Sequence, residues 1–215
     1  MMTLPAFADR RSAGQILARR LDDYAGRNDA VVLALPRGGV PVAYEVARAL
    51  RAPLDVFIVR KLGFPGHEEL AIGAIASGGT IVVDPNFVLG LSREQLDAVT
   101  RKEYAELRRR EQAYRDDRQS LDISGKTVIV VDDGLATGAS MHAAVRALRE
   151  RGAARIVVAV PVASPHAVES LKLEAHEVVA ALIPDGFYAV GAYYEDFTQT
   201  TDEEVRELLR SAAAA

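Results

Sequence analysis

The feature that most constrains the fold is a regular alternation of short apolar runs with longer segments of helical periodicity. Five runs are rich in apolar and β-branched residues, at residues 31–35, 54–59, 127–131, 155–160 and 177–182. All but the second are almost continuously apolar, which is typical of strands covered on both faces. Helical patterns separate several of the runs, at residues 40–50, 139–151 and 165–173. This alternation predicts an α/β fold, Rossmann-like, with a mainly parallel sheet and helices on both faces.

Three segments lie outside this alternation. Residues 10–26 and 92–118 are expected to be helical, and the second of these carries eight basic and seven acidic residues. Near-cancelling charge of this kind is typical of a solvated helix face rather than of a nucleic-acid-binding surface. Residues 185–201 are rich in aromatic and acidic side chains, and a short helix is predicted at 202–210.

Length and composition favour a single cytoplasmic domain over residues 1–215. We expect a core at about residues 28–183, a hood formed by residues 184–201 with the N-terminal segment, and a helical insertion at about 92–118. No apolar run approaches the ~18–20 residues needed to span a bilayer, and the absence of cysteine excludes disulfides and thiolate metal sites. The formal net charge of −4 gives no broad basis for binding DNA or anionic membranes.

The most informative stretch is Val128–Ser140, in which a buried strand runs into two carboxylates, a turn of small residues and a helix. Small residues let backbone N–H groups converge on an anion, and a helix N-terminus adds a favourable dipole. Thr137 and Ser140 offer hydroxyl groups to phosphate oxygens, whereas Asp132 and Asp133 suit the hydroxyls of a ribose or a hydrated Mg²⁺. The stretch therefore predicts a ribose 5-phosphate site. The alternative, a capped turn, does not explain two carboxylates directly after an apolar strand.

Glycines and cations follow two other apolar runs. Residues 35–41 read Leu-Pro-Arg-Gly-Gly-Val-Pro, where glycines permit close backbone approach to an anion and Arg37 can form bidentate phosphate contacts. Arg60 and Lys61 follow the second run. A tight surface turn and solvated cations are the alternatives at these two places.

Residues 128–140 resemble the loop that binds phosphoribosyl pyrophosphate (PRPP) in type I phosphoribosyltransferases, and the resemblance covers about residues 28–200. The Leu-Pro-Arg-Gly-Gly and Arg-Lys-Leu-Gly motifs are similar to motifs of a poorly characterised branch of that family. The resemblance implies transfer of the 5-phosphoribosyl group from PRPP to an acceptor nitrogen, in particular that of a nucleobase, with release of pyrophosphate. The implied partners are PRPP and a small acceptor, the implied cofactor is Mg²⁺, and a homodimer is left open. A non-catalytic regulatory protein that binds PRPP or a nucleotide is the alternative.

The resemblance also assigns site residues. Asp132, Asp133 and Lys61 are the implied catalytic residues. The loop around the 5′-phosphate comprises Gly134, Leu135, Ala136, Thr137, Gly138, Ala139 and Ser140. The residues implied to bind pyrophosphate are Arg37, Gly38, Gly39, Arg60 and Lys61. Magnesium is expected near the two aspartates, held mainly through water and pyrophosphate without direct protein ligands. Gly134 and Ala139 depart from the family pattern, which usually has an aliphatic residue and a glycine there.

A lid and a base pocket are implied in the same way. Residues 62–79 contain five glycines and are similar in position to a flexible loop that closes over the site. Phe187, and next to it Tyr188, are the candidates for stacking on the base, although aromatic packing within the hood is the alternative. Pro161–Ala163 stand where family members that act on 6-oxopurines carry a lysine, which favours adenine or a non-purine acceptor.

Overall fold

A computed structural model describes residues 6–83, 91–115 and 118–214, without the side chains of Glu68, Glu69 and Ala71. The elements in chain order are α1 (Arg10–Ala18), η1 (Asp22–Tyr24), β1 (Ala30–Ala34), α2 (Gly39–Leu50), β2 (Leu54–Val56), β3 (Val59–Phe64), β4 (His67–Ala76), β5 (Thr80–Val83), α4 (Arg93–Arg115), β6 (Thr127–Val131), α5 (Ala139–Glu150), β7 (Arg155–Val162), α6 (Pro165–Lys172), β8 (Glu177–Leu182), η2 (Val190–Tyr193) and α7 (Asp202–Ala213). Within these ranges, no helix is long and apolar enough to cross a membrane.

The central sheet contains five parallel strands in the order β2-β1-β6-β7-β8. The chain runs outward from β1 to β2 on one side and from β6 through β7 to β8 on the other. The connections therefore diverge between β1 and β6, where Ala34 pairs with Val131. Such a switch point is where α/β sheets bind ligands, outside the carboxyl ends of the strands. The predicted parallel α/β architecture is confirmed.

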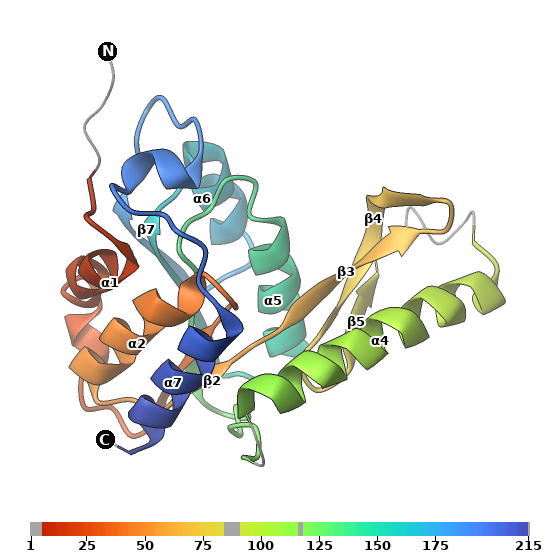
Figure 1. Ribbon diagram of the computed structural model, residues 1–215, viewed down its shortest axis with the longest axis horizontal. Coiled ribbons are helices and arrows are strands. Elements are labelled where there is room, and N and C mark those ends of the chain that lie inside the picture. Colours follow the sequence, from red (N-terminus) through yellow and green to blue (C-terminus); the bar gives the residue numbers. More distant parts are fainter. Residues whose placement is uncertain (1–5, 84–90, 116–117, 215) are drawn as a thin grey trace.

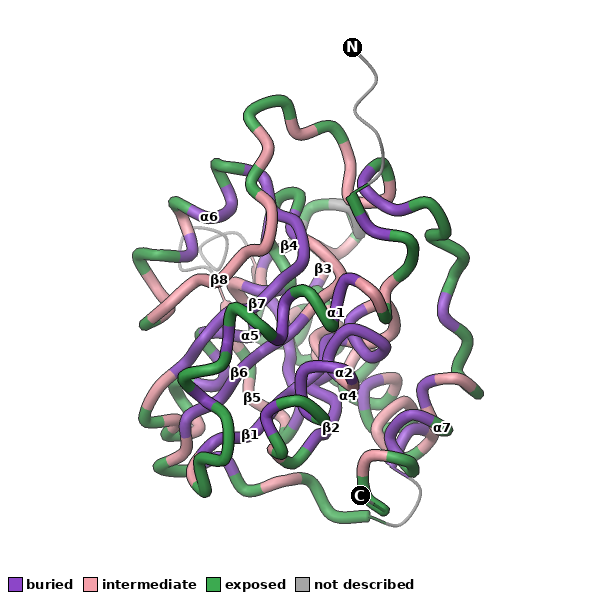
Figure 2. The backbone as a smooth tube through the Cα atoms, turned by 90° about the vertical axis from the view of Figure 1, so that its left-hand side faces the viewer, coloured by how far each residue is buried: buried purple, intermediate pink, exposed green. Residues whose placement is uncertain are grey.

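Helices cover both faces of the central sheet (Figure 1), and alternate side chains of the central strands join two different buried clusters. In β1, Val32 and Ala34 join a buried cluster with α1, α2 and α7, whereas Val31 and Leu33 join a second cluster with α5 and α6. All residues of β1 and β6 are buried, as Figure 2 shows for the interior of the molecule. A fully buried valine or leucine contributes roughly 1.5–3 kcal/mol relative to an exposed one. Burial on both faces explains why these runs are continuously apolar.

The strand predicted over residues 54–59 is wrong in its extent. The parallel strand β2 ends at Val56, and the last hydrogen bond to its neighbour joins Phe57 N–H to Ala34 O at 2.8 Å. Because β1 ends at Ala34, the chain has no partner strand beyond this point. Ile58 instead exchanges hydrogen bonds with Ser77, through the Ser77 hydroxyl and the Ser77 main-chain N–H. The chain then continues as the antiparallel strand β3.

Strands β3, β4 and β5 form an antiparallel sheet that, with α4, extends away from the central sheet as an arm (Figure 1). The arm includes residues 62–79, which were expected to form a lid loop. They form a hairpin with a turn at Gly66, where φ is 80°. Antiparallel strand pairing, with register shifts at Leu62–Phe64, therefore replaces the expected loop. Closure of this segment over the site stays a prediction.

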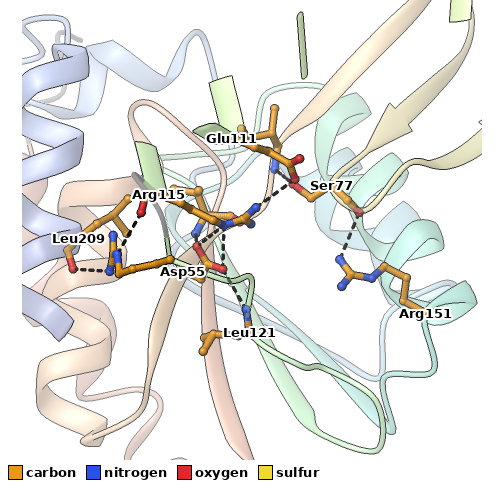
Figure 3. Close-up of polar contacts among 10 residues, drawn as sticks. Asp55, Ser77, Glu111, Arg115, Leu121, Arg151 and Leu209 are labelled. Carbon is orange, nitrogen blue, oxygen red and sulfur yellow. Dashed lines mark hydrogen bonds and ion pairs between the residues drawn. The ribbon is translucent and has the colours of Figure 1, made fainter. Parts of the chain in front are cut away.

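The long helix α4 is anchored to the edge of the central sheet by a buried ion-pair network (Figure 3). Arg115 Nε donates to both carboxylate oxygens of Asp55, at 2.9 and 3.0 Å, and a terminal nitrogen of Arg115 donates to Val56 O at 2.7 Å. Glu111 accepts from the same guanidinium at 3.1 Å. The polar interruption of the second apolar run is therefore an anchor for the helix predicted at residues 92–118.

The hood joins residues that are distant in the sequence. Ala6 and Phe7 donate main-chain hydrogen bonds to Tyr193 O at 3.0 Å, and Glu195 N–H donates to Phe7 O at 2.9 Å. The ring centroids of Phe7 and Tyr194 are 5.3 Å apart. These contacts form a small apolar cluster beside the end of β7, which brings residues 6–7 against residues 193–195.

Candidate functional site

The loops after β1 and β6 lie in close contact at the switch point. Leu35 N–H donates to Val131 O at 2.8 Å. A Cβ atom at Gly39 would lie 2.7 Å from Val131 O, and one at Gly38 would lie 2.0 Å from Asp133 Oδ2. Any larger residue at these two positions would displace the neighbouring loop. The structure therefore places the predicted pyrophosphate loop directly against the predicted acidic pair.

Asp132 and Asp133 follow β6 and differ in their hydrogen-bond partners. Asp132 Oδ1 accepts a hydrogen bond from the main-chain N–H of Asp133 at 2.8 Å. Asp133 Oδ2 accepts one from Arg10 Nε at 2.8 Å. No side chain in the described ranges donates a hydrogen bond to Asp132, which leaves acceptor capacity on its carboxylate for a ligand.

The electrostatic environment of this pair opposes double ionisation. Burial raises the pKa of Asp132 well above its usual range, and the charge of Asp133 raises this pKa further. Burial also raises the pKa of Asp133, against the opposing effect of the hydrogen bond from Arg10. Neighbouring carboxyl groups with poor solvation and raised pKa values are typical of functional sites, since hydroxyl donors or cations of a ligand can compensate them.

Residues 134–140 form the turn between β6 and α5. Ala136, Thr137, Ala139 and Ser140 are exposed, whereas the Leu135 side chain is buried in the core. Gly138 has a φ of 75° and precedes α5, to which it offers no capping side chain; Ala139 N–H makes a long hydrogen bond of 3.5 Å to Thr137 Oγ1. Such a weakly capped helix start leaves N–H groups available to an anion. Phosphate binding by this turn stays a prediction, and Leu135 could contribute only its main chain.

The same turn is fixed by the neighbouring strand and by the hood. Ser164 Oγ donates to Ala136 O at 2.6 Å, and Leu135 N–H donates to Val162 O at 2.9 Å. A Cβ atom at Gly134 would lie 2.5 Å from a methyl group of Val190 in η2. The family departure at Gly134 is therefore explained by close packing of the hood on this turn.

Arg37 and Arg60 both form ion pairs with elements outside the central sheet. An Arg37 terminal nitrogen lies 3.5 Å from Asp202 Oδ1 in α7. Arg60 lies within β3, where its guanidinium contacts Glu103 Oε2 of α4 at 2.7 Å. The expectation that Arg60 ends a strand of the parallel sheet is wrong, because the chain has already turned into the arm. Pyrophosphate binding by either arginine stays a prediction.

Lys61 lies closer to the phosphate turn. It was expected at the end of the parallel strand and instead lies within β3 of the arm. Its exposed side chain lines a cavity of about 150 Å³ together with Ser140 and His142 of α5. The arm, rather than the central sheet, therefore brings this cation beside the predicted phosphate site.

The two candidate base-binding rings differ in exposure. Phe187 is half-buried, and its ring stacks on Tyr193 at a centroid distance of 5.7 Å and an interplanar angle of 25°. Tyr188 is 90% exposed. The packing of Phe187 agrees with the alternative that these aromatics form the core of the hood, and base stacking stays a prediction.

Sequence analysis missed two residues of the site, Arg10 and Tyr194. The Tyr194 hydroxyl donates to the main-chain oxygen of Asp133 at 2.6 Å, and burial raises the pKa of this tyrosine, which keeps the donor protonated. Arg10 and Tyr194 are separated from Asp133 by 123 and 61 residues. No local pattern reports contacts of that range, so only the folded chain shows them.

Comparison with known proteins gives a consistent result. The chain matches the family described as phosphoribosyl transferase domain over residues 9–187, a range that includes the acidic pair and both loops. The chain is similar to the crystal structure of TT1426 from Thermus thermophilus, with a TM-score of 0.86 and 49% sequence identity. That similarity covers 95% of this chain and 98% of the other.

Curated relatives point the same way. Proteins from two strains of Mycobacterium tuberculosis, provisionally named phosphoribosyl transferases, are 47% identical over 208 residues, which is 96% of this chain and 47% of each relative. The chain thus spans about half the length of these relatives. A uracil phosphoribosyltransferase from Streptomyces griseus is 45% identical over 53 residues, a quarter of each chain.

Proposed function

Because the chain belongs to the phosphoribosyl transferase domain family, we propose that it transfers the 5-phosphoribosyl group of PRPP to an acceptor nitrogen and releases pyrophosphate. One observation carries the proposal. Two adjacent carboxylates, Asp132 with a main-chain donor and Asp133 paired with Arg10, lie between a helix start with no N-cap side chain and a glycine loop at a single switch point. This arrangement suits the hydroxyls, 5′-phosphate and pyrophosphate of PRPP, respectively.

The residues act mainly by positioning and electrostatics. The carboxylates accept hydrogen bonds from the ribose hydroxyls, while the turn with Thr137 and Ser140 holds the 5′-phosphate. As the bond between the anomeric carbon and pyrophosphate breaks, positive charge develops on the sugar, which the nearby negative charges stabilise. The acceptor nitrogen forms the new bond to that carbon, and its proton leaves to solvent or a base.

The donor set fits a weakly held magnesium ion. In the described part of the chain, no group of three or more His, Cys, Asp or Glu side chains could hold a metal. Mg²⁺ often keeps several waters and uses one or two carboxylates together with substrate phosphates. Asp132 and Asp133 fit that requirement through water. When bound, the ion supplies charge neutralisation for the pyrophosphate.

The acceptor pocket is proposed to favour adenine or a non-purine over hypoxanthine and guanine. Val162 and Ala163 are completely buried apolar residues at the end of β7, where a lysine donor to an exocyclic oxygen would otherwise lie. A site without that donor gains little from a 6-oxo group. Phe187 is the proposed stacking ring above this strand end.

The test is an acceptor screen. Protein, PRPP and Mg²⁺ are incubated with single nucleobases, and pyrophosphate release is measured. We expect release that depends on one base other than guanine or hypoxanthine. Phe187→Ala is expected to raise the KM for that base with little change in kcat, because stacking acts in the ground and transition states alike. Leu173→Ala, at a position that is 87% exposed and lies outside the hood, is the control.

Rapid turnover of guanine would contradict the specificity argument. Absence of turnover with every base, alongside tight PRPP binding, would favour the non-catalytic regulatory alternative. Absence of PRPP binding would contradict both.

A further inference from the structure

Arg10 begins α1 and is held in a defined direction by the start of that helix. Asp9 Oδ1 accepts from Ser12 N–H at 2.7 Å, and Ser12 Oγ accepts from Asp9 N–H at 3.0 Å. This reciprocal capping box fixes the first turn. Main-chain pairing of Phe7 with Tyr193 and of Ala8 with Asp196 fixes the segment before it. The backbone on the N-terminal side of Arg10 is therefore held by hydrogen bonds, and it positions the Arg10 side chain beside the acidic pair.

The guanidinium of Arg10 contacts the acidic pair and the hood at the same time. Nε donates to Asp133 Oδ2 at 2.8 Å, and a terminal nitrogen donates to Thr198 O at 2.7 Å. Its central carbon lies 3.9 Å from the ring centroid of Phe197. Only 11% of the Arg10 side chain is exposed. One buried cation thus joins a proposed ribose-binding carboxylate to residues 197–198 of the hood.

The direction of the Asp133 carboxylate depends on this contact. The titratable groups that face Asp133 within the described ranges are Arg10, Asp132 and the hydroxyl of Tyr194. The Asp132 carboxyl contacts the main-chain N–H of Asp133, and the Tyr194 hydroxyl contacts its main-chain oxygen. A Cβ atom at Gly38 would lie 2.0 Å from Asp133 Oδ2 and 3.3 Å from Arg10 Nε. Arg10 is therefore the attraction that keeps this carboxylate turned toward the glycine loop.

We propose that Arg10 is a positioning residue for PRPP, which holds the Asp133 carboxylate ready for a ribose hydroxyl and ties that orientation to docking of the hood. The inference rests on the proposed function, since it assigns PRPP to Asp133. Arg10 acts through Asp133 rather than on the transferred group. Its loss therefore weakens PRPP in the ground and transition states alike, and raises the PRPP KM more than it lowers kcat.

The test is a double-mutant cycle read by calorimetry of PRPP with Mg²⁺. The variants are Arg10→Met, Asp133→Asn and both together, with Arg11→Met as the matched control because Arg11 is the exposed neighbour on the same helix. We expect Arg10→Met to lower PRPP affinity about tenfold or more, as for loss of a hydrogen bond to a charged group. In the Asp133→Asn background, the same change is expected to cost less than about twofold.

Equal losses in both backgrounds, or no loss in either, would overturn the inference. Hydrogen exchange at residues 194–198 in the free protein is the second readout, expected to be faster in Arg10→Met and unchanged in Arg11→Met. Unchanged exchange in Arg10→Met would overturn the coupling to the hood.

If Arg10→Met does not fold, the Arg10→Lys variant tests the inference instead. A lysine keeps the charge but cannot hold Asp133 and Thr198 O together in the guanidinium geometry. The PRPP affinity of Arg10→Lys is therefore expected to be intermediate between those of the wild type and Asp133→Asn. Wild-type affinity with wild-type exchange in Arg10→Lys would overturn the inference. Wild-type protein that fails to bind PRPP would instead overturn the proposed function, and the inference with it.

Discussion

Asp55 in β2 and Asp132 after β6 are carboxylates with little access to solvent on the same sheet, but their surroundings differ. Asp55 accepts hydrogen bonds from Arg115 on both oxygens, from Val56 N–H at 2.7 Å and from Leu121 N–H at 3.2 Å (Figure 3). Asp132 accepts one, from the N–H of the adjacent residue. The first carboxylate has its charge and acceptor capacity compensated by the protein itself, and the second does not.

The difference separates an acid that holds the fold together from one that is proposed to bind a ligand. A buried charge that is fully paired holds elements together, here α4 and the central sheet, and is costly to break. A buried carboxylate that lacks donors destabilises the free protein and is retained where a ligand supplies what is missing. Four predictions test this contrast, beginning with the largest free-energy change.

Arg115→Met is expected to lower the free energy of unfolding by about 3–5 kcal/mol, because it leaves Asp55 buried without its cation. The measurement is urea denaturation at neutral pH. Arg108→Met is the matched control, since Arg108 is exposed on the same helix. Asp55→Leu combined with Arg115→Met is expected to recover much of the loss. A decrease in unfolding free energy below about 1 kcal/mol in Arg115→Met would contradict the structural role assigned to the Asp55–Arg115 pair.

Asp132→Asn combined with Asp133→Asn is expected to weaken PRPP binding by about 100-fold or more, equivalent to about 2.7 kcal/mol. The neutral amides accept fewer and weaker hydrogen bonds from ribose hydroxyls than the carboxylates do. Calorimetry with Mg²⁺ present measures the change, and circular dichroism checks that the fold is intact. Unchanged affinity would show that these residues do not hold the sugar.

Asp132→Asn alone is expected to stabilise the free protein at about pH 7 to 8, because the neutral amide removes a charge that burial disfavours. Burial raises the pKa of Asp132 in the folded state, so the folded state binds this proton more tightly than the unfolded chain. The associated stability is present below about pH 4 and lost as pH rises through the raised pKa.

The advantage of Asp132→Asn should therefore grow with pH, and urea midpoints measured from about pH 4 to 8 test it. Glu207→Gln, at an exposed carboxylate of α7, is the control and is not expected to stabilise. A pH-independent difference between Asp132→Asn and wild type would contradict the argument.

Glu106→Gln is expected to cost least, below about 1 kcal/mol, because its ion pairs lie near the surface and are screened. Hydrogen bonds from Arg109 and Arg110 lower the pKa of Glu106 to about 2. The small contribution is present above the usual pKa of 4.5 and is lost as pH falls toward 2. Urea midpoints at about pH 3 and 6 measure it, and a pH dependence of the same sign as that of Asp132 would contradict the assignment.

The sequence predicted the switch-point loops better than the arm, and the reason is the range of the contacts. Val128–Ser140 is a local pattern, since the strand, the carboxylates and the helix start are contiguous, and the structure places them as expected. The strand boundary at Val56 depends instead on where β1 ends and on Ser77, neither of which is adjacent in sequence. Periodicity cannot report a change of pairing partner.

Sequence analysis did not predict the partners of Asp55 and Asp133 either. Asp55 makes the second apolar run less continuous than the others, and sequence analysis assigned it no role. Its partner Arg115 lies 60 residues away, within a helix of many arginines that look alike in sequence. Arg10 gave no local signal, because the contact that distinguishes it from Arg11 is made with Asp133, 123 residues further along the chain.

The contact between Arg10 of the N-terminal segment and Thr198 of the hood can form only at a defined stage of protein synthesis. Arg10 and Thr198 are 188 residues apart, so at roughly 5–20 residues per second they emerge from a ribosome about 9–38 s apart. Asp133 follows Arg10 by 123 residues, so in the last third of that interval the nascent chain has both aspartates but not the hood residues that hold the Arg10 guanidinium beside them. The contacts among Arg10, Asp133 and the hood therefore form only after residue 198 has emerged, even if the central sheet has formed earlier.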